Sequence, residues 1–214
     1  MTAVEPDPGL RERKKRRTRE AIESAALRLF DERGFAATTI AEIATVADVS
    51  PRTFFGYFPS KEAVLYGESG EAFAAFERDL AVPRDPGVTT AIDVLRGWIH
   101  TWFTEHPPQL ERERLLHRLK ATEPSVAAYE RQLMARFEDA MTDALAADLG
   151  LEPGDVRARM VAAAAVASLR ALEPLDADGC SPAKQHPPDA EALAVLDDAL
   201  LFLNSGLAAL LPRA

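Results

Sequence analysis

Residues 38–61 read TTIAEIATVADVSPRTFFGYFPSK and carry the signals for two short helices with almost no chain between them. Thr39 and Glu42 form a T-x-x-E pair, which predicts a capping box at the start of the first helix. Ser50 followed by Pro51 supplies the residue types preferred at the N-cap and the first position of the second helix. The stretch therefore predicts a helix-turn-helix, whose second helix fits the major groove of DNA.

The ends of these helices are also marked by residue type. The first helix must stop near Asp48, a residue that tolerates turn conformations through its own side-chain hydrogen bonds. Pro59 ends the second helix, because the residue before a proline avoids helical backbone angles. Ser60 can then cap a third helix that begins at Lys61 and continues to about Leu80.

An amphipathic helix is predicted immediately before this stretch, over about residues 18–33. Gly34 follows it in the position preferred just past a helix end. Apolar residues recur on one face of the helix and continue into the next segments, which predicts a small core. Its expected members are Ile22, Ala25, Ala26, Leu29, Phe30, Phe35, Ile40, Ile43, Val49, Phe54 and Phe58.

The run from Thr18 to Leu65 resembles the N-terminal domain of the tetracycline-repressor (TetR) family of bacterial regulators. The resemblance is carried by RTREAIESAALRLFDERGF, then TTIAEIATVADVS, then TFFGYFPSKEAVL. It implies an all-α fold, with an N-terminal three-helix helix-turn-helix domain that binds DNA and a C-terminal helical bundle that binds a ligand and dimerises. Two positions depart from the family: Asp48 replaces the usual glycine of the turn, and Gly56 stands where a polar residue is commoner.

Side chains at the N-terminal end of a DNA-reading helix reach base edges. Arg52 can form a bidentate pair with guanine O6 and N7, and Thr53 can bond a base or pack on a thymine methyl. Tyr57 lies one turn later on the same face, where its hydroxyl suits a phosphate oxygen. Phe55 occupies the position of the family's usual tyrosine. It lacks the tyrosine hydroxyl, so it can only pack against the DNA backbone.

Three further residues are expected at the phosphates. Thr39 and Lys61, at the starts of their helices, resemble the phosphate anchors of the family. Ser50 can both cap its helix and donate to phosphate, because the first turn of a helix favours anions. The predicted DNA-contacting residues are Thr39, Ser50, Pro51, Arg52, Thr53, Phe55, Tyr57 and Lys61.

The net charge of −9 at first argues against a nucleic-acid partner, but the charge is unevenly distributed. Residues 1–67 carry 11 Lys/Arg against 10 Asp/Glu, whereas residues 68–214 carry 14 against 24. The basic residues gather at Arg11, Arg13, Lys14, Lys15, Arg16, Arg17 and Arg19. We therefore expect a basic N-terminal arm at 1–17 that lies on DNA, a DNA-binding domain at 18–67, and a ligand-binding and dimerisation domain at 68–214.

In the second domain, helices are predicted at about 88–105, 110–121 and 125–149. They carry both tryptophans of the chain and several phenylalanine and methionine residues. Ordinary core packing accounts for most of these, but such a bundle is also where a pocket for an apolar small molecule can open. The expected ligand-binding residues are Trp98, Trp102, Phe103, His117, Tyr129, Phe137 and Met141.

The last two predicted helices have a sequence pattern that is typical of helices packing against one another or against a second subunit. Small residues, VAAAAVA, occupy 161–167 of a helix predicted over about 155–172. After a proline-bearing loop at 173–189, leucines at 193, 196, 200, 203, 207 and 210 form a narrow seam of the coiled-coil kind. The seam could face the protein's own core or a second subunit, and the family resemblance favours a homodimer through these two helices.

Other classes of protein find little support in the sequence. The single cysteine, Cys180, excludes an intramolecular disulfide framework, and neither a signal peptide nor a membrane-spanning run is apparent, so we expect a cytoplasmic protein. The spacing of His100, His106 and His117 does not match a metal site, and no cofactor is expected. No catalytic constellation is visible, so we do not expect an enzyme.

These observations predict a DNA-binding transcriptional regulator, a homodimeric repressor released from an inverted-repeat operator by an apolar small molecule. A ligand-independent repressor or an activator would have the same sequence features. A small-molecule-binding helical protein or enzyme with a vestigial DNA-binding domain is the alternative from a different class.

Overall fold

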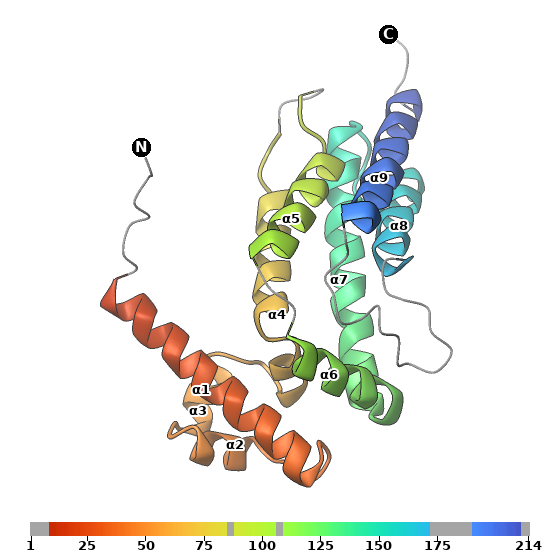
Figure 1. Ribbon diagram of the computed structural model, residues 1–214. Helices are drawn as coiled ribbons and strands as arrows, with labels where there is room; N and C mark the ends of the chain where they lie inside the picture. Colours follow the sequence, from red (N-terminus) through yellow and green to blue (C-terminus); the bar gives the residue numbers. More distant parts are fainter. Residues whose placement is uncertain (1–8, 85–87, 106–108, 172–189, 211–214) are drawn as a thin grey trace. The chain divides into compact units, whose positions relative to one another are not determined.

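The computed structural model describes residues 9–84, 88–105, 109–171 and 190–210, and all the regular structure in these ranges is helical (Figure 1). The all-α fold class is thereby confirmed. The helices are α1 Leu10–Arg33, α2 Ile40–Val46, α3 Pro51–Phe55, α4 Lys61–Leu80, α5 Ala91–Glu105, α6 Leu110–Thr122, α7 Pro124–Asp148, α8 Val156–Ala171 and α9 Ala190–Leu210.

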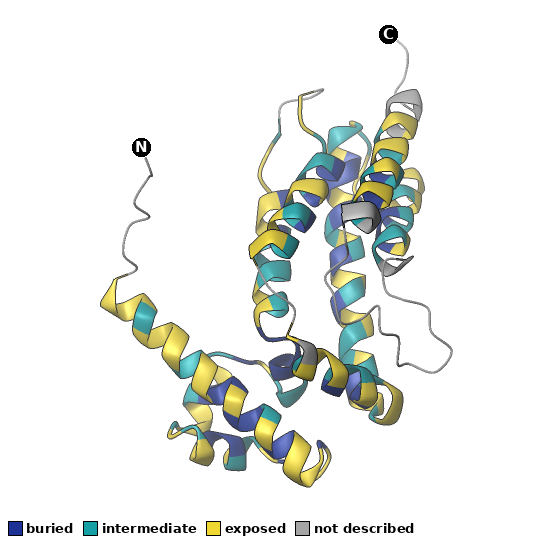
Figure 2. Ribbon diagram, viewed as in Figure 1, coloured by how far each residue is buried: buried dark blue, intermediate teal, exposed yellow. Residues whose placement is uncertain are grey.

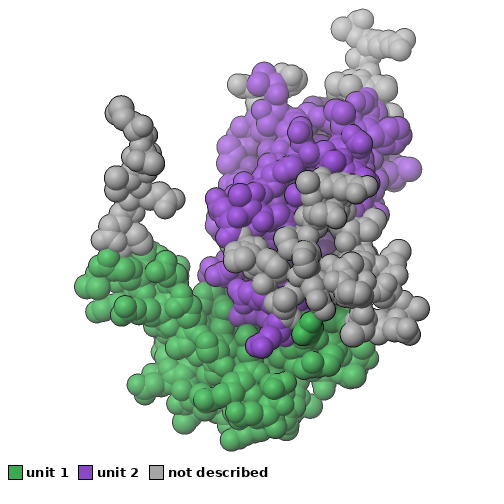
Figure 3. Space-filling model, in the orientation of Figure 1, with its two compact units in different colours: residues 1–67, 114–129 green, residues 68–113, 130–214 purple. Residues whose placement is uncertain are grey.

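The chain divides into two compact units (Figure 3). Unit 1 consists of residues 1–67 and 114–129, and unit 2 of residues 68–113 and 130–214. The chain leaves unit 1 at Gly67, where the sequence also places a domain boundary. Residues 114–129 differ from expectation, because they join unit 1 instead of the second domain.

Unit 1 is built on one apolar stripe of α1, which Figure 2 shows as buried. The stripe packs on side chains from α2, α3 and the segments beside them. Buried members of the predicted core are Ile22, Ala25, Ala26, Leu29, Phe30, Phe35, Ile43, Phe54 and Phe58. Ile40 and Val49, also predicted for this core, are only half-buried.

The turn between α2 and α3 has the backbone geometry that the sequence requires. Asp48 takes a φ of 53°, in the left-handed region where glycine is the usual residue. The backbone N–H of Val49 donates to the carbonyl of Ala44 at 2.9 Å, which closes the end of α2. Aspartate can replace glycine here because its short polar side chain tolerates left-handed angles.

α1 is longer than the sequence pattern predicts. It begins at Leu10 and not near residue 18, so the basic run is helical from its first residues. The predicted start of this helix near residue 18 is therefore wrong, whereas the contact of the basic residues with DNA stays a prediction. Residues 1–8 lie outside the described part. The apolar stripe starts only at Ile22, so periodicity gave no signal for the first three turns.

The core of unit 2 is formed by α4, α5, α7, α8 and α9. Its largest buried side chains include Phe76, Leu95, Ile99 and Phe137. Alanines at 158, 162 and 165 are also buried and allow α8 to approach its neighbours closely. At Gly67, the residue before unit 2 begins, α4 has non-helical angles of φ 45° and ψ −123°.

Candidate nucleic-acid interface and cavity

α3 begins with a cap made by two hydroxyl side chains. The Ser50 Oγ accepts a hydrogen bond from the backbone N–H of Thr53 at 3.0 Å, and the two hydroxyls lie 2.8 Å apart. Pro51 occupies the first helical position. Ser50, Pro51 and Arg52 remain exposed. The first turn thus presents a guanidinium and two hydroxyls, groups that hydrogen-bond to base edges and phosphates.

The other side chains in and after α3 divide between core and solvent. The rings of Phe54 and Phe58 are buried, with centroids 5.9 Å apart. Phe55 is 55% exposed and meets the Phe54 ring edge-on. Tyr57 is half-buried. Gly56 has ordinary right-handed angles, so its backbone does not require glycine.

The capping box predicted at Thr39 is present. The hydroxyl of Thr39 accepts from the Glu42 backbone N–H at 3.2 Å, and the Glu42 carboxylate accepts from the Thr39 backbone N–H at 2.9 Å. This backbone hydrogen bond, followed by one from the Thr39 hydroxyl, lowers the pKa of Glu42 below its usual value. Thr39 is exposed, so its hydroxyl can be reached by a phosphate while it caps α2.

Lys61 is held by the chain that follows α1. Its Nζ donates to the carbonyls of Phe35 at 2.8 Å and Thr38 at 3.2 Å, and lies 4.3 Å from the centre of the Phe35 ring. An ammonium group has three donors, so one N–H remains for a phosphate. Lys61 therefore has a structural role whether or not it contacts DNA.

The basic residues of α1 do not all face solvent. Arg11, Lys14, Lys15, Arg16 and Arg17 are exposed, whereas Arg13 is half-buried.

Arg19 departs furthest from the expectation of a basic arm, since its side chain is only 12% exposed. It donates to the Gly67 carbonyl at 2.9 Å, pairs with Glu23 at 3.1 Å and stacks over the Phe58 ring at 4.3 Å. Including Arg19 among the DNA-facing cations is therefore wrong, because its guanidinium is committed inside unit 1.

The seven predicted ligand-binding residues are divided between the two units. Five belong to unit 2 and two to unit 1: Trp98, Trp102, Phe103, Phe137 and Met141 in the former, His117 and Tyr129 in the latter. In unit 2 the aromatic rings fill space against one another, with Phe76 stacked 4.9 Å from Phe137 and 5.1 Å from Trp98. In unit 1, Tyr129 packs on Tyr66 at 5.2 Å. None of the seven residues lines the cavity described next, and their role in binding a ligand stays a prediction.

That cavity has a volume of about 820 Å³ and lies near the C-terminal ends of α4 and α7. Its size is within the range of small-molecule pockets. One wall is formed by Ala140, Ala144 and Ala147, which recur at i, i+4 and i+7 along α7. Methyl side chains in a row leave the space that larger residues would fill. This spacing is the signal in the sequence that could have indicated the cavity.

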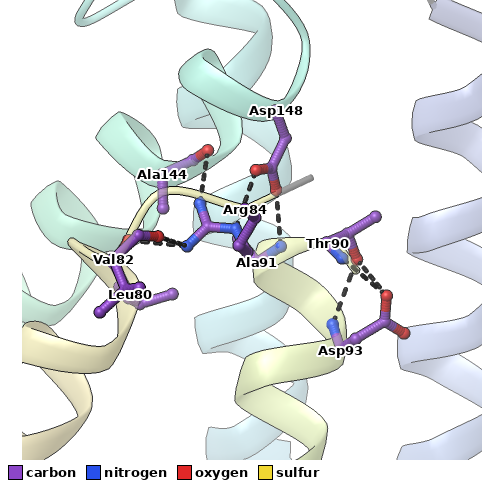
Figure 4. Close-up of polar contacts among 8 residues, drawn as sticks. All are labelled: Leu80, Val82, Arg84, Thr90, Ala91, Asp93, Ala144 and Asp148. Carbon is purple, nitrogen blue, oxygen red and sulfur yellow. Dashed lines mark hydrogen bonds and ion pairs between the residues drawn. The ribbon is translucent and has the colours of Figure 1, made fainter. Parts of the chain in front are cut away.

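Arg84 and Asp148, which both line the cavity, form an ion pair (Figure 4). The Arg84 Nε donates to Asp148 at 2.9 Å, and its terminal nitrogens donate to the carbonyls of Leu80 at 2.7 Å and Ala144 at 3.2 Å. The Asp148 carboxylate also accepts from the Ala91 backbone N–H at 2.6 Å. One half-buried pair therefore satisfies backbone groups at the end of α4, at the start of α5 and near the end of α7. The sequence analysis did not identify either residue.

The leucine seam of α9 faces the subunit's own core. Leu196 and Leu200 are 3% and 0% exposed, and Leu193 and Leu203 pack against the same cluster. The side chains of Leu207 and Leu210 lie outside the described residues. Leu196 and Leu200 therefore pack in the core of the subunit and are not available to a second subunit, whereas a homodimer through α8 and α9 stays a prediction.

Other apolar side chains occupy the outward faces of α8 and α9. On α8, Val156, Met160, Ala163 and Ala167 recur at i, i+4, i+7 and i+11. On α9, Val195, Ala199, Phe202 and Gly206 have the same spacing. Met160 and Phe202 are 68% and 76% exposed. We call these eight residues the outer stripes.

Within the described residues, no group of three or more histidine, cysteine, aspartate or glutamate side chains could hold a metal ion. Over the same ranges, no helix is long and apolar enough to cross a membrane.

Comparison with known proteins identifies the first unit. Residues 22–66 match the family described as bacterial regulatory proteins, tetR family. The chain is 53% identical over 57 residues to the HTH-type transcriptional regulator TcmR of Streptomyces glaucescens, covering 27% of this chain and 25% of TcmR. It is 31% identical over 106 residues to the HTH-type transcriptional repressor NicS of Pseudomonas putida, covering 46% of this chain and 48% of NicS.

These matches span a quarter and about half of the lengths of the two relatives. A solved structure of SmeT with triclosan has the same fold, with a TM-score of 0.51 at 23% identity over 90% of each chain.

Proposed function

Because residues 22–66 carry the DNA-binding domain of the TetR family of bacterial regulators, we propose that the chain is a homodimeric transcriptional repressor released from its operator by a small molecule. The observation that carries the proposal is the first turn of α3. There Ser50, Arg52 and Thr53 present hydrogen-bonding groups from a helix anchored in the core by Phe54 and Phe58. The proposal includes no catalytic activity.

In this proposal α3 lies in the major groove. Arg52 pairs with guanine, Thr53 contacts the neighbouring base, and Phe55 packs on a thymine methyl or the sugar-phosphate backbone. Thr39, Ser50, Tyr57 and the remaining N–H of Lys61 bind phosphates, and Pro51 packs against the groove wall. The exposed cations of α1 add attraction to the phosphates that does not depend on sequence.

The homodimer in this proposal forms through the outer stripes of α8 and α9. Apolar residues at helical spacing on two neighbouring helices form a surface that a second copy can bury against its own identical surface, as two-fold symmetry requires. Ala163, Ala167, Ala199 and Gly206 are small, so helices from two subunits can approach closely. The two DNA-binding domains of the dimer would then recognise an inverted-repeat operator.

The effector in this proposal binds in unit 2 and acts through α4 and α7. Each of these helices begins with residues of unit 1 and ends beside the cavity. A ligand that is bound more tightly in one arrangement of these helices shifts the population towards that arrangement. The name of NicS as a repressor supports repression, and the complex of SmeT with triclosan supports a small-molecule ligand.

Retention of genomic DNA fragments by the purified protein tests this function. At raised salt, we expect a few fragments of the source genome to stay bound while bulk DNA is released, because non-specific binding depends mainly on phosphate contacts. Arg52→Ala should weaken this preference and keep the non-specific binding. Equal retention of all fragments by the unaltered protein would refute the proposal.

A further inference from the structure

The cavity of unit 2 has a distinctive balance of charge. Four ionisable side chains line it: Glu77, Arg84, Asp143 and Asp148. Three of these are acidic and one is basic, so the lining carries a net negative charge at neutral pH.

Two of the three carboxylates already have cationic partners. Asp148 is paired with Arg84, and Glu77 accepts a hydrogen bond from Arg136, which does not line the cavity. Asp143 is exposed and has no hydrogen bond or ion pair with any described residue. The charge that remains to be compensated at the cavity is therefore the single carboxylate of Asp143.

The Arg84 guanidinium has little capacity left for an anionic ligand. It donates to Asp148 and to the carbonyls of Leu80, Val82 and Ala144. One of its five N–H groups remains, so an anion that needs more donors would have to displace these hydrogen bonds, and it would also meet three carboxylates. Charge therefore disfavours anionic ligands.

The rest of the lining suits an apolar body. Leu80, Val82, Pro83 and Leu149 contribute larger apolar side chains, and Ala81 and the alanines of α7 contribute methyl groups. Asn204 and Ser205 of α9 add amide and hydroxyl groups. Pockets with mostly apolar walls and a few polar groups are typical of small-molecule sites.

We propose that this cavity binds a bulky monovalent organic cation, with its apolar body against the alanine wall of α7 and its charge beside Asp143. Binding of the cation does not depend on the proposed function. That the cation is the effector, however, rests on the proposed function. The cation would lie beside Arg84 and Asp148, which hold the ends of α4 and α5.

Calorimetric titration of the full chain with tetraphenylphosphonium tests the proposal. Tetraphenylborate serves as the probe of matched size and opposite charge. We expect the cation to bind with one site per chain and the anion to bind at least tenfold more weakly. No binding of the cation, or equal binding of the two ions, would overturn the proposal.

Matched variants locate the site. Asp143→Asn should weaken binding of the cation about two- to fivefold, the range expected for one charge pair at an exposed rim. Asp139→Asn removes an exposed carboxylate of α7 that does not line the cavity and should have no effect. Ala147→Phe should abolish binding by filling the cavity, whereas Ala135→Phe, at an exposed position of the same helix, should not.

Unchanged binding in Asp143→Asn and Ala147→Phe would place the cation elsewhere and overturn the assignment. Circular dichroism of each variant verifies that it is folded, and the milder Ala147→Leu replaces any variant that is not. Genomic DNA retention is measured on the same samples. If the protein retains selected DNA fragments but does not bind the cation, this inference alone is refuted. If it binds the cation but retains all DNA fragments equally, the proposed function alone is refuted.

Discussion

Two cations of unit 1 are held where the chain leaves helical geometry. Lys61 donates to the carbonyls of Phe35 and Thr38, in the segment that follows α1. Arg19 donates to the carbonyl of Gly67, the residue at which α4 departs from helical angles. Carbonyls at such places lack the regular intrahelical donor, so a charged side chain can satisfy them.

Lys61→Met should lower the stability of the protein because two carbonyls lose a charged donor. We expect the free energy of unfolding, measured in urea, to fall by about 1–3 kcal/mol. Lys15→Met is the control, since Lys15 is exposed on α1, and its stability should stay within about 0.5 kcal/mol of the unaltered protein. Equal stability of Lys61→Met and Lys15→Met would contradict the structural role of Lys61.

Arg52→Ala tests the assignment of base reading. The substitution should cost about 1–3 kcal/mol of affinity for the cognate operator and relax the preference at one base-pair position. Fluorescence anisotropy with singly substituted duplexes measures both effects. Arg159→Ala, in an exposed arginine of α8, is the control and should change neither. If Arg52→Ala lost affinity equally for operator and random DNA, Arg52 would be a phosphate contact.

At the scale of elements, periodicity and capping located the helices closely. The helix-turn-helix could be predicted because its signals are local: the Thr39 capping box, Asp48 in the turn, and the Ser50–Pro51 start. The first turns of α1 could not, because the basic run carries no apolar stripe. Exposed helix positions are not revealed by a hydrophobic pattern.

Contacts between elements were harder to predict than the elements. The leucine seam of α9 is as regular as a dimer seam, but repeat spacing does not say which surface covers it, and Leu200 lies in the subunit core. The cavity was missed for a related reason. Ala144 and its neighbours count as apolar in any pattern, although their small size leaves a hollow.

Phe202→Asp should dissociate the proposed dimer without unfolding the subunit. Phe202 is 76% exposed, so its replacement disturbs no core packing. Leu201→Asp is the matched control, because Leu201 is exposed on the same helix but points about 100° away from Phe202. Analytical ultracentrifugation should give monomers for the first variant and dimers for the second. Dimers in both would remove the outer stripes as the interface.

At the scale of the whole molecule, a regulator needs energetic coupling between its DNA site and its ligand site. α4 and α7 contain residues of both units, which gives a covalent route for such coupling. The coupling is a difference in ligand affinity between two states of the protein, and it acts equally in both directions.

Reciprocal titrations test this coupling. If a bound effector weakens operator affinity by some factor, typically about 5–150-fold, operator DNA must weaken effector affinity by the same factor. Anisotropy of labelled operator gives the first factor, and calorimetry of the effector with and without operator gives the second. An effector that binds tightly but leaves operator affinity unchanged would make the protein a ligand-independent regulator.

The most direct test of the central claim is selection from a random library of DNA duplexes by the purified full-length protein. Sequence-specific reading by two copies of α3 predicts enrichment of one consensus with approximate two-fold symmetry. In a parallel selection, Arg52→Ala should lose preference at one symmetric pair of positions, while the rest of the consensus persists. A library that emerges unenriched after repeated rounds, although the protein is folded, would contradict the claim that this chain reads DNA.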